Sequence, residues 1–451
     1  MEKFEGYVFA ALCSTNFLVS CLIFSKVTRE QREPYMDEIF HVPQAQKYCQ
    51  GKFSEWDPMI TTPPGLYLAS VGVIKPVVWL ADLTGNVVCS TAMLRFINLL
   101  FNCGNLYLIY LLLCKLHPRE KTRTASRRIL SALSLSIFPV LYFFNFLYYT
   151  DAGSTFFILC LPHDALRLPQ SRGAPRRLLR ALSPDQHHLA GILRRHSGGR
   201  QNGRGLAGGA YQKEGGEVSS LPGAAVAVLQ AAWPYAAVAG GFLAFIVWND
   251  GIVVGDRTSH EACLNFPQIF YFFCFSFFLS FPVSLWYQRV IRFLQALRKQ
   301  PLLFLLLTVV SLLLVWKFTH VHKYLLADNR HYPFYVWKNL FRRHELIRFL
   351  LITVYIFAGW NFLDSFRSRS LFWTLAFLSC LLASTVPQKL LEFRYFIVPY
   401  LMYRLHMPLP SMPRLVAEFL LYAAVNAATI YVFIAKTFRW PDSADTQRFM
   451  W

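Results

Sequence analysis

Two adjacent carboxylates, a histidine and two glutamines lie in the stretch "EPYMDEIFHVPQAQKY", residues 33–48. A proline near its start suits the first turn of a helix, so we expect Asp37 and Glu38 near the helix N-terminus. Helical spacing places Asp37, His41 and Gln44 on one face. Either carboxylate could accept a proton as a general base. The alternative is that both acidic residues only complement the helix dipole.

Two later stretches combine cations with acidic side chains. The stretch "KFTHVHKYLLADNRHYPFYVWK" contains His322, Lys323, Asp328, Arg330 and His331. The stretch "QKLLEFRYFIVPY" places Glu392 and Arg394 at the end of an apolar run. The alternative for this second stretch is a helix end whose long side chains reach towards water.

A third stretch, "NDGIVVGDRTSHEACLNFPQ", is also rich in titratable groups. Its candidate residues are Asp256, Arg257, His260 and Glu261. An ion pair in a solvated loop is the alternative interpretation. Asp151, in "FLYYTDAGS", lies at the end of a further apolar run.

These residue types suit the transfer of a sugar from a lipid phosphate. The reaction needs a carboxylate to take the proton from the acceptor hydroxyl, and cations to hold the phosphate that leaves. Because phosphate is already a good leaving group, no general acid is required. One base and a set of cations are therefore sufficient.

The elements that must position these groups are apolar. Of 451 residues, 55% are hydrophobic and only 16% are charged, which indicates a polytopic membrane protein. The formal charge of +20 comes from basic residues in short loops between apolar runs, which favours membrane topology over nucleic-acid binding. The pattern predicts an all-α fold with roughly 10–12 transmembrane helices in one multi-span domain, residues 1–451. The apolar runs lie at residues 7–24, 94–114, 129–149, 223–248, 267–287, 301–316, 347–363, 371–386, 393–405 and 414–435.

Lysine and arginine in short loops predict the orientation. We expect the basic loops at 115–128, 289–299 and 367–369 in the cytosol. The first loop, residues 25–92, then faces the lumen, provided that residues 63–83 lie along the membrane interface instead of crossing it.

The same orientation places the cations of residues 317–338 in the lumen, against the usual positive-inside bias. Either the orientation is inverted, or these cations bind an anionic ligand.

Residues 162–222 do not match the rest of the chain. From Pro162 to Gln212 the sequence is rich in arginine and glycine, has no lysine and contains a single aromatic residue, Tyr211. One interpretation is a basic, disordered linker. The other is a reading-frame slip, because codons for "PDQHHL" shifted by one nucleotide can spell "QTNIIW", a plausible membrane sequence.

Cysteine and histidine spacing predicts no metal site. Cys49, Cys89 and Cys263 fall in loops, and a pair of them could form a disulfide if those loops face an oxidising lumen.

Several long motifs, in order along the chain, resemble one known family. They include "YMDEIFHVPQAQKYCQGKFSEWDPMITTPPGLY", "NFLYYTDAGS", "HKYLLADNRHYPFYVWK", "VPQKLLEFRYF" and the terminal "QRFMW". Together they resemble the dolichyl-phosphate-glucose-dependent alpha-1,2-glucosyltransferases of the endoplasmic reticulum, within the GT-C superfamily. The resemblance covers nearly all of the chain except about 162–225.

The resemblance implies an inverting single displacement without a cofactor. Glucose would pass from dolichyl phosphate glucose to the diglucosylated dolichol-linked oligosaccharide, as its third and outermost glucose. The usual base of such enzymes is an acidic residue of the first luminal loop, here Asp37 or Glu38, and we favour Asp37 because it shares a face with His41 and Gln44.

Roles for the other clusters follow from the same chemistry. The expected phosphate-binding cations are His322, Lys323, Arg330, His331 and Arg394. The expected substrate-binding residues are His41, Gln44, Asp151, Asp256, Arg257, His260, Glu261, Asp328 and Glu392. The alternatives are another polyprenyl-phosphate sugar transferase or, in a different class, a membrane transporter or channel-associated protein.

Overall fold

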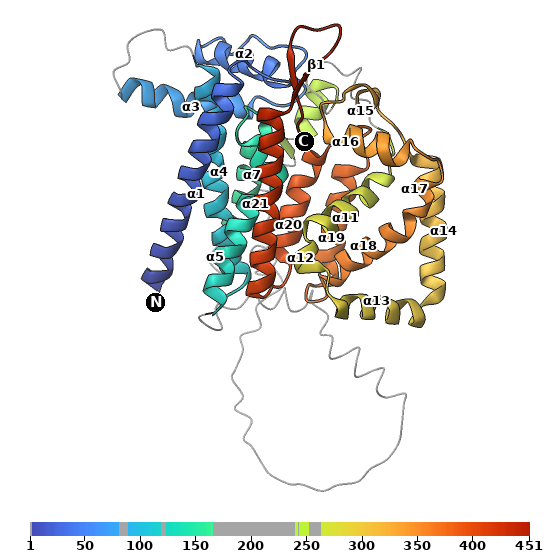
Figure 1. Cartoon of the computed structure of the whole chain (residues 1–451). Helices are drawn as coiled ribbons and strands as arrows, with labels where there is room; N and C mark the ends of the chain where they lie inside the picture. The colour runs from blue at the N-terminus through green and yellow to red at the C-terminus, as the bar shows by residue number, and fades with distance from the viewer. Residues whose placement is uncertain (1, 81–88, 119–122, 166–239, 242, 252–262) are drawn as a thin grey trace, which may run out of the picture. The chain divides into compact units, whose positions relative to one another are not determined.

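A computed structural model describes residues 2–80, 89–118, 123–165, 240–241, 243–251 and 263–451 (Figure 1). In these ranges the secondary structure is helical apart from one two-stranded hairpin. The helices of the first half are α1 (Glu2–Glu30), α2 (Glu38–Cys49), α3 (Gly65–Leu80), α4 (Thr91–Leu116), α5 (Arg123–Ser136), α6 (Pro139–Phe144) and α7 (Thr150–Ala165). The helices that follow are α11 (Pro267–Leu279), α12 (Phe281–Ser284), α13 (Tyr287–Lys299), α14 (Pro301–Phe318), α15 (Lys323–Ala327), α16 (Tyr332–Val336), the π-helix η1 (Trp337–Phe341), α17 (Ile347–Leu350), α18 (Ile352–Asp364), α19 (Leu371–Thr385), the 3-10 helix η2 (Phe393–Phe396), α20 (Ile397–His406) and α21 (Met412–Ala435).

Five of the described helical segments are long and apolar enough to cross a membrane. They are Phe4–Glu30, Thr91–Leu116, Pro301–Phe318, Ile347–Asp364 and Met412–Ala435. Four shorter apolar helices are Gly65–Leu80, Thr150–Leu161, Pro267–Leu279 and Leu371–Thr385. The predicted all-α polytopic membrane fold is confirmed, while the total of roughly 10–12 spans stays a prediction. The predicted span at 223–248 lies largely outside the described residues.

Two spans that the sequence predicts as continuous are interrupted. In residues 129–149, α5 ends at Ser136 and α6 begins at Pro139. In residues 267–287, α11 ends at Leu279 and α12 begins just before a proline. Proline has no N–H for the helical ladder but suits the first turn of a new helix, so each apolar run divides there.

The chain divides into two compact units. The first consists of residues 1–166, 253–368 and 378–451, and the second of residues 167–252 and 369–377. In the first unit, α4 packs against α1, α5 and α7, α21 packs against α5 and α6, and α11 packs against α18. All of the candidate residues lie in this first unit, apart from those that the structure does not describe.

The first loop forms a compact cap on one end of α4. Figure 1 shows α3 lying across the direction of α1 and α4, and its 16 residues include Pro76. This arrangement favours the interfacial interpretation for residues 63–80, the described part of the segment 63–83. Helix α2 packs on α3 through a buried cluster that includes Val42, Tyr48 and Tyr67.

A disulfide between Cys49 and Cys89 joins the end of α2 to the residues just before α4. Cys263 is not part of it. Of the three loop cysteines, the structure therefore pairs the two of the first loop.

The end of the chain folds back onto the same region. Strand β1 (Thr437–Arg439) follows α21 directly and pairs antiparallel with β2 (Thr446–Arg448). Beyond β2, Met450 forms a parallel bridge with His331. The hairpin thus carries residues 446–451 to the loop that holds the predicted phosphate-binding cations.

Candidate active site

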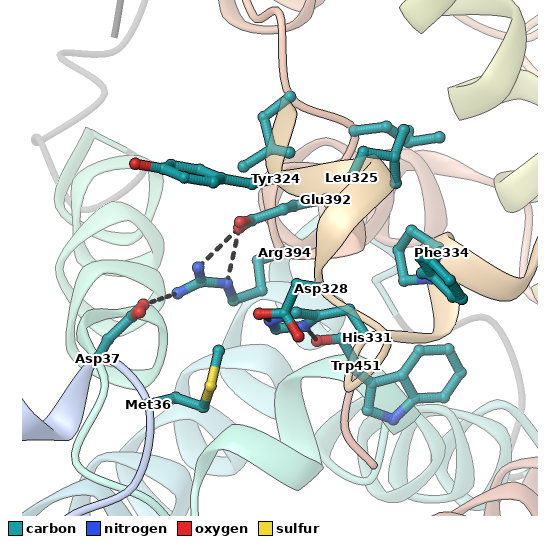
Figure 2. Close-up of a pocket in the computed structure, with 13 residues that line it drawn as sticks. Met36, Asp37, Tyr324, Leu325, Asp328, His331, Phe334, Glu392, Arg394 and Trp451 are labelled. Carbon is teal, nitrogen blue, oxygen red and sulfur yellow. Dashed lines mark hydrogen bonds and ion pairs between the residues drawn. The ribbon is translucent and has the colours of Figure 1, made fainter. Parts of the chain in front are cut away.

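A cavity of about 130 Å³ lies among the start of α2, the 324–334 segment, the residues before η2 and Trp451 (Figure 2). It is lined by Met36, Asp37, Tyr324, Leu325, Asp328, His331, Pro333, Phe334, Leu390, Leu391, Glu392, Arg394 and Trp451. Three of the predicted clusters therefore contribute to one cavity.

Asp37 presents its carboxylate to this cavity instead of capping its own helix. Aspartate at a helix N-cap usually accepts a main-chain N–H, but the Asp37 side chain makes no such bond to α2. Its Oδ2 lies 3.2 Å from Arg394 Nη1, and 40% of the side chain is exposed. Its main-chain N–H donates to the Tyr149 hydroxyl at 3.2 Å. The preceding residue, Met36, has a φ of 56°, a strained conformation for a non-glycine residue that re-aims the chain just before Asp37.

Arg394 lies within ion-pair distance of three carboxylates, and Figure 2 shows two of them, Asp37 and Glu392. Its Nη2 and Nε donate to Glu392 Oε2 at 2.7 and 3.0 Å, and its Nη1 lies 3.8 Å from Asp151 Oδ2 as well as near Asp37. Its guanidinium also lies over the Tyr149 ring, 5.1 Å from the centroid. The carboxylates outnumber this cation, so the cluster has an excess of negative charge.

Glu38 has different surroundings from its neighbour. It is fully buried, and its two oxygens accept from Arg95 Nε at 2.7 Å and Arg95 Nη2 at 2.6 Å. Main-chain N–H groups of Tyr35 and Tyr148 donate to the same carboxylate at 3.0 and 2.6 Å. Glu38 does not line the cavity, and its bonds tie the start of α2 to α4 and to the segment before α7.

His41 and Gln44 lie behind Asp37, in contact with the cap. His41 Nδ1 shares a hydrogen bond with the Tyr67 hydroxyl. Burial lowers the pKa of His41 more than the nearby Asp37 raises it, which favours a neutral imidazole. Gln44 bonds the Glu55 carbonyl at 2.7 Å and the Asp57 N–H at 3.0 Å. Both side chains hold the first loop together and neither lines the cavity.

In the 317–338 stretch, Asp328 and His331 line the cavity and Arg330 faces a different set of partners. Arg330 donates from Nε and Nη2 to Asp328, each at 2.8 Å, and from Nη1 to Gln447 at 3.1 Å. Burial raises the pKa of Asp328, but the hydrogen bonds from Arg330, together with the charges of His331 and Arg330, outweigh it and hold that pKa below its usual value. Arg330 is thus neutralised by its own loop.

The ring of His331 is held in one orientation. Its Nδ1 lies 2.7 Å from the Trp451 main-chain oxygen, which can only accept, so Nδ1 carries a proton. Its Nε2 lies 3.9 Å from Asp328 Oδ2. His331 can therefore offer a second N–H, and a positive charge, only when Nε2 is protonated.

The other two predicted cations lie outside the cavity lining. His322 is buried, and its Nδ1 accepts the Tyr324 N–H at the start of α15. Lys323 is exposed, with its Nζ 5.2 Å from the Tyr324 ring centroid. Of the five cations predicted to bind phosphate, His331 and Arg394 are the two that line the cavity.

Asp256, Arg257, His260 and Glu261 lie outside the described residues. Within the described ranges no group of three or more His, Cys, Asp or Glu side chains is arranged to hold a metal ion.

Sequence reasoning missed several residues that shape the site. Arg95 is a lone cation within the apolar run 94–114, and an isolated charge in such a run is a signal for a buried partner. Tyr149 and Trp451 gave no signal beyond their place in the motifs "FLYYTDAGS" and "QRFMW". The strain at Met36 could not have been read from residue types.

An all-α fold with several helices long and apolar enough to span a membrane, and a cavity lined in part by charged side chains, defines a multi-pass integral membrane protein. The chain belongs to the DIE2/ALG10 family, whose model matches residues 31–181 and 213–405. The residues between the two matched ranges fall inside the anomalous segment 162–222.

The chain is also similar to curated relatives along its whole length. A protein of Mus musculus, named Dol-P-Glc:Glc(2)Man(9)GlcNAc(2)-PP-Dol alpha-1,2-glucosyltransferase, is 51% identical over 496 residues, covering 100% of both chains. A Homo sapiens protein with the same name is 50% identical over 482 residues, again with 100% of both chains covered. An Arabidopsis thaliana relative of that name is 31% identical over 491 residues, covering 93% of this chain and 95% of its own. No solved structure matches this chain.

Proposed function

We propose that this chain transfers a glucose in alpha-1,2 linkage from dolichyl phosphate glucose to the lipid-linked oligosaccharide Glc2Man9GlcNAc2-PP-dolichol. Full-length relatives of about half-identical sequence carry the name of this activity. The assignment of this activity to particular residues rests on the position of the Asp37 carboxylate. It lines the cavity, and its Oδ2 lies 3.2 Å from Arg394 Nη1.

Asp37 is the proposed general base. It accepts the proton of the acceptor hydroxyl while that oxygen bonds to the anomeric carbon of glucose. The bond from this carbon to the phosphate oxygen breaks, and its electron pair leaves with the dolichyl phosphate. A single displacement of this kind inverts the configuration, which turns a beta-linked donor into an alpha-linked product. The fully paired, buried Glu38 is poorly suited to this role.

His331 and Arg394 are the cations best placed to stabilise the leaving phosphate, because both line the cavity. Arg394 also orients Asp37 through their ion pair. We assign His322, Lys323 and Arg330 supporting positions, because none of them lines the cavity and Arg330 is paired with Asp328 and Gln447. The proposed reaction uses no cofactor and no metal.

We propose that the site faces the lumen of the endoplasmic reticulum. The Cys49–Cys89 disulfide lies in the same loop as Asp37, and disulfides form in oxidising compartments such as this lumen. The basic helix α13, with Arg298 and Lys299 in its last turn, would then lie at the cytosolic side, in agreement with the positive-inside rule.

The test is a transfer assay in microsomes that lack this activity, with the chain expressed as written. Dolichyl phosphate glucose and a diglucosylated acceptor should give the triglucosylated product. Asp37→Asn should lower kcat on the order of 10²-fold or more, because it removes the base and keeps the side-chain shape. Asp442→Asn, which changes an exposed aspartate outside the cavity lining, should leave kcat unchanged.

Two results would contradict the proposal. Normal activity of Asp37→Asn would exclude this residue as the base. Product formation with dolichyl phosphate mannose, but not with the glucose donor, would favour another polyprenyl-phosphate sugar transferase.

A further inference from the structure

The segment Thr446–Trp451, which we call the clasp segment, touches the Asp37 loop, the cavity and the ends of two long helices. It lies more than four hundred residues from the Asp37 loop in sequence, yet Tyr35 and Arg448 bond each other directly. Its motif "QRFMW" has no place in the reaction proposed above.

Arg448 connects the C-terminal ends of α1 and α21. Its Nη2 donates to the Glu30 carbonyl at 2.7 Å, and its Nη1 donates to the Phe433 and Ile434 carbonyls at 2.8 and 3.1 Å. These carbonyls belong to the last turns of the two helices, where main-chain oxygens lack helical partners and carry a partial negative charge. Only 6% of Arg448 is exposed, so a buried cation is held here by helix ends.

The same arginine fixes the chain that leads to Asp37. Its Nε donates to Gln31 Oε1 at 2.8 Å. The Tyr35 hydroxyl donates to the Arg448 carbonyl and accepts the Arg448 N–H, both at 2.8 Å. Gln31 and Tyr35 lie in the segment that leads into Met36, whose strained conformation persists only where the surroundings enforce it. Through its bonds to Gln31 and Tyr35, Arg448 helps to hold Met36 in this conformation.

The far end of the clasp segment fixes the opposite wall of the cavity. The Met450 N–H donates to the Arg330 carbonyl at 2.9 Å, and the Tyr332 N–H donates to the Met450 carbonyl at 3.0 Å. The Trp451 oxygen accepts from His331 Nδ1, and its indole contacts the rings of Tyr332 and Phe393. Figure 2 shows Trp451 beside His331.

We infer that the clasp segment sets the position of Asp37 relative to His331 and Arg394, with Arg448 as a positioning residue and Trp451 as a wall of the substrate pocket. The inference rests on the proposed function for its kinetic readout. A general base must be held accurately, since a misplacement of about 1 Å can cost on the order of 10²-fold in rate. A wall residue acts mainly on substrate binding.

The first experiment compares Arg448→Met with Arg439→Met, which changes an exposed arginine on the other strand of the same hairpin. We expect Arg448→Met to lower kcat at least about tenfold, with the donor KM within about threefold of wild type. Arg439→Met should behave as wild type. Tyr35→Phe removes only the hydroxyl that joins the clasp segment to the Asp37 loop, and it should lower kcat in the same direction even if Arg448→Met does not fold.

Trp451 is tested by a pair of substitutions. Trp451→Ala should raise the KM of the donor or of the acceptor several-fold, with a smaller effect on kcat. Trp451→Phe keeps an aromatic wall, so its KM should return most of the way to the wild-type value.

Hydrogen exchange provides a readout that does not need activity. In Arg448→Met, the amides of residues 35–40 and 330–332 should exchange faster than in Arg439→Met. Unchanged exchange in these segments, or a kcat of Tyr35→Phe equal to that of wild type, would overturn the inference. Failure of the wild-type chain to make the triglucosylated product would instead count against the proposed function, and the exchange data would still decide the role of the clasp segment.

Discussion

At the scale of single residues, Asp37 and Glu38 are neighbours in the chain with opposite tasks. The Asp37 side chain lines the cavity and makes no capping hydrogen bond to α2. Glu38 is fully buried and its carboxylate accepts four hydrogen bonds. The buried pair with Arg95 crosses 57 residues of sequence and anchors α2 on α4. Residue spacing predicted both carboxylates at the helix start. That Asp37 is partly exposed while Glu38 is buried depends on α4, and spacing could not reveal it.

Glu38→Gln should therefore reduce stability far more than Asp37→Asn. Removing one partner of a buried ion pair leaves an uncompensated charge, here on Arg95, and costs about 3–5 kcal/mol. Asp37 is partly exposed, and the loss of its pair should cost less than about 1 kcal/mol. The measurement is the apparent Tm of each variant in detergent. Equal Tm values for the two variants would contradict these assignments.

At the scale of elements, the packing of α4 on α7 depends on glycine. A Cβ added at Gly104 would lie 2.5 Å from Cε2 of Phe156, so the ring occupies the space that any other residue would fill. Small residues allow helices in membranes to approach closely. This contact sets the position of α7, which begins beside Asp151.

Gly104→Ala should destabilise the protein by about 1–3 kcal/mol through overpacking. Gly72→Ala is the matched control, because a Cβ there meets nothing within 4 Å. That variant should be neutral or more stable by up to about 1 kcal/mol, since alanine is the better helix former. The measurement is the Tm of both variants in detergent. A Gly104→Ala protein as stable as Gly72→Ala would show that the Phe156 ring can move aside.

The disulfide is the second element-scale constraint, because it closes the loop that contains α3. Cys49→Ser should lower stability by about 2–4 kcal/mol, the usual worth of a native disulfide. The Tm of wild type should fall on reduction, and the Tm of Cys49→Ser should not respond. Cys263→Ser, which changes a free cysteine, should resemble wild type in both conditions. A response of Cys49→Ser to the reductant would point to a different disulfide.

Prediction from sequence succeeded where composition and periodicity decide the outcome. The all-α membrane fold follows from the apolar runs, and three polar clusters at the ends of such runs meet in one cavity. Prediction from sequence failed where the direction of a side chain decides whether it lines the cavity. Lys323 and Arg330 share a stretch with His331 but contact other partners. It also missed the breaks at Ser136 and Leu279, because hydropathy does not register a proline that starts a new helix inside an apolar run.

At the scale of the whole molecule, the chemistry predicts independence from metal ions. The leaving group is a phosphate, and cationic side chains can stabilise it without a Lewis acid. Activity should therefore be the same with EDTA as without it, in a transfer assay at constant ionic strength. Loss of activity with EDTA, followed by recovery with a divalent cation, would contradict this expectation.

The relatives also differ from this chain in length. The alignment with the Mus musculus protein runs over 496 residues, more than the 451 of this chain, so that relative contains residues that this chain lacks. The family model leaves a gap between residues 181 and 213. Both observations agree with a reading-frame slip within 162–222, which stays a prediction because residues 166–222 lie outside the described part.

The three carboxylates around Arg394 also bear on how quickly the spent carrier departs. In dolichyl phosphate glucose the phosphate is a diester with a single negative charge. After transfer it is a monoester, with a charge of about −1.5 to −2 near neutral pH. Since Arg394 stays shared among Asp37, Asp151 and Glu392, it can stabilise the phosphate as the bond breaks but holds the departed product less tightly than an unpaired arginine would. We therefore expect weak product inhibition, so that turnover continues while dolichyl phosphate accumulates around the enzyme.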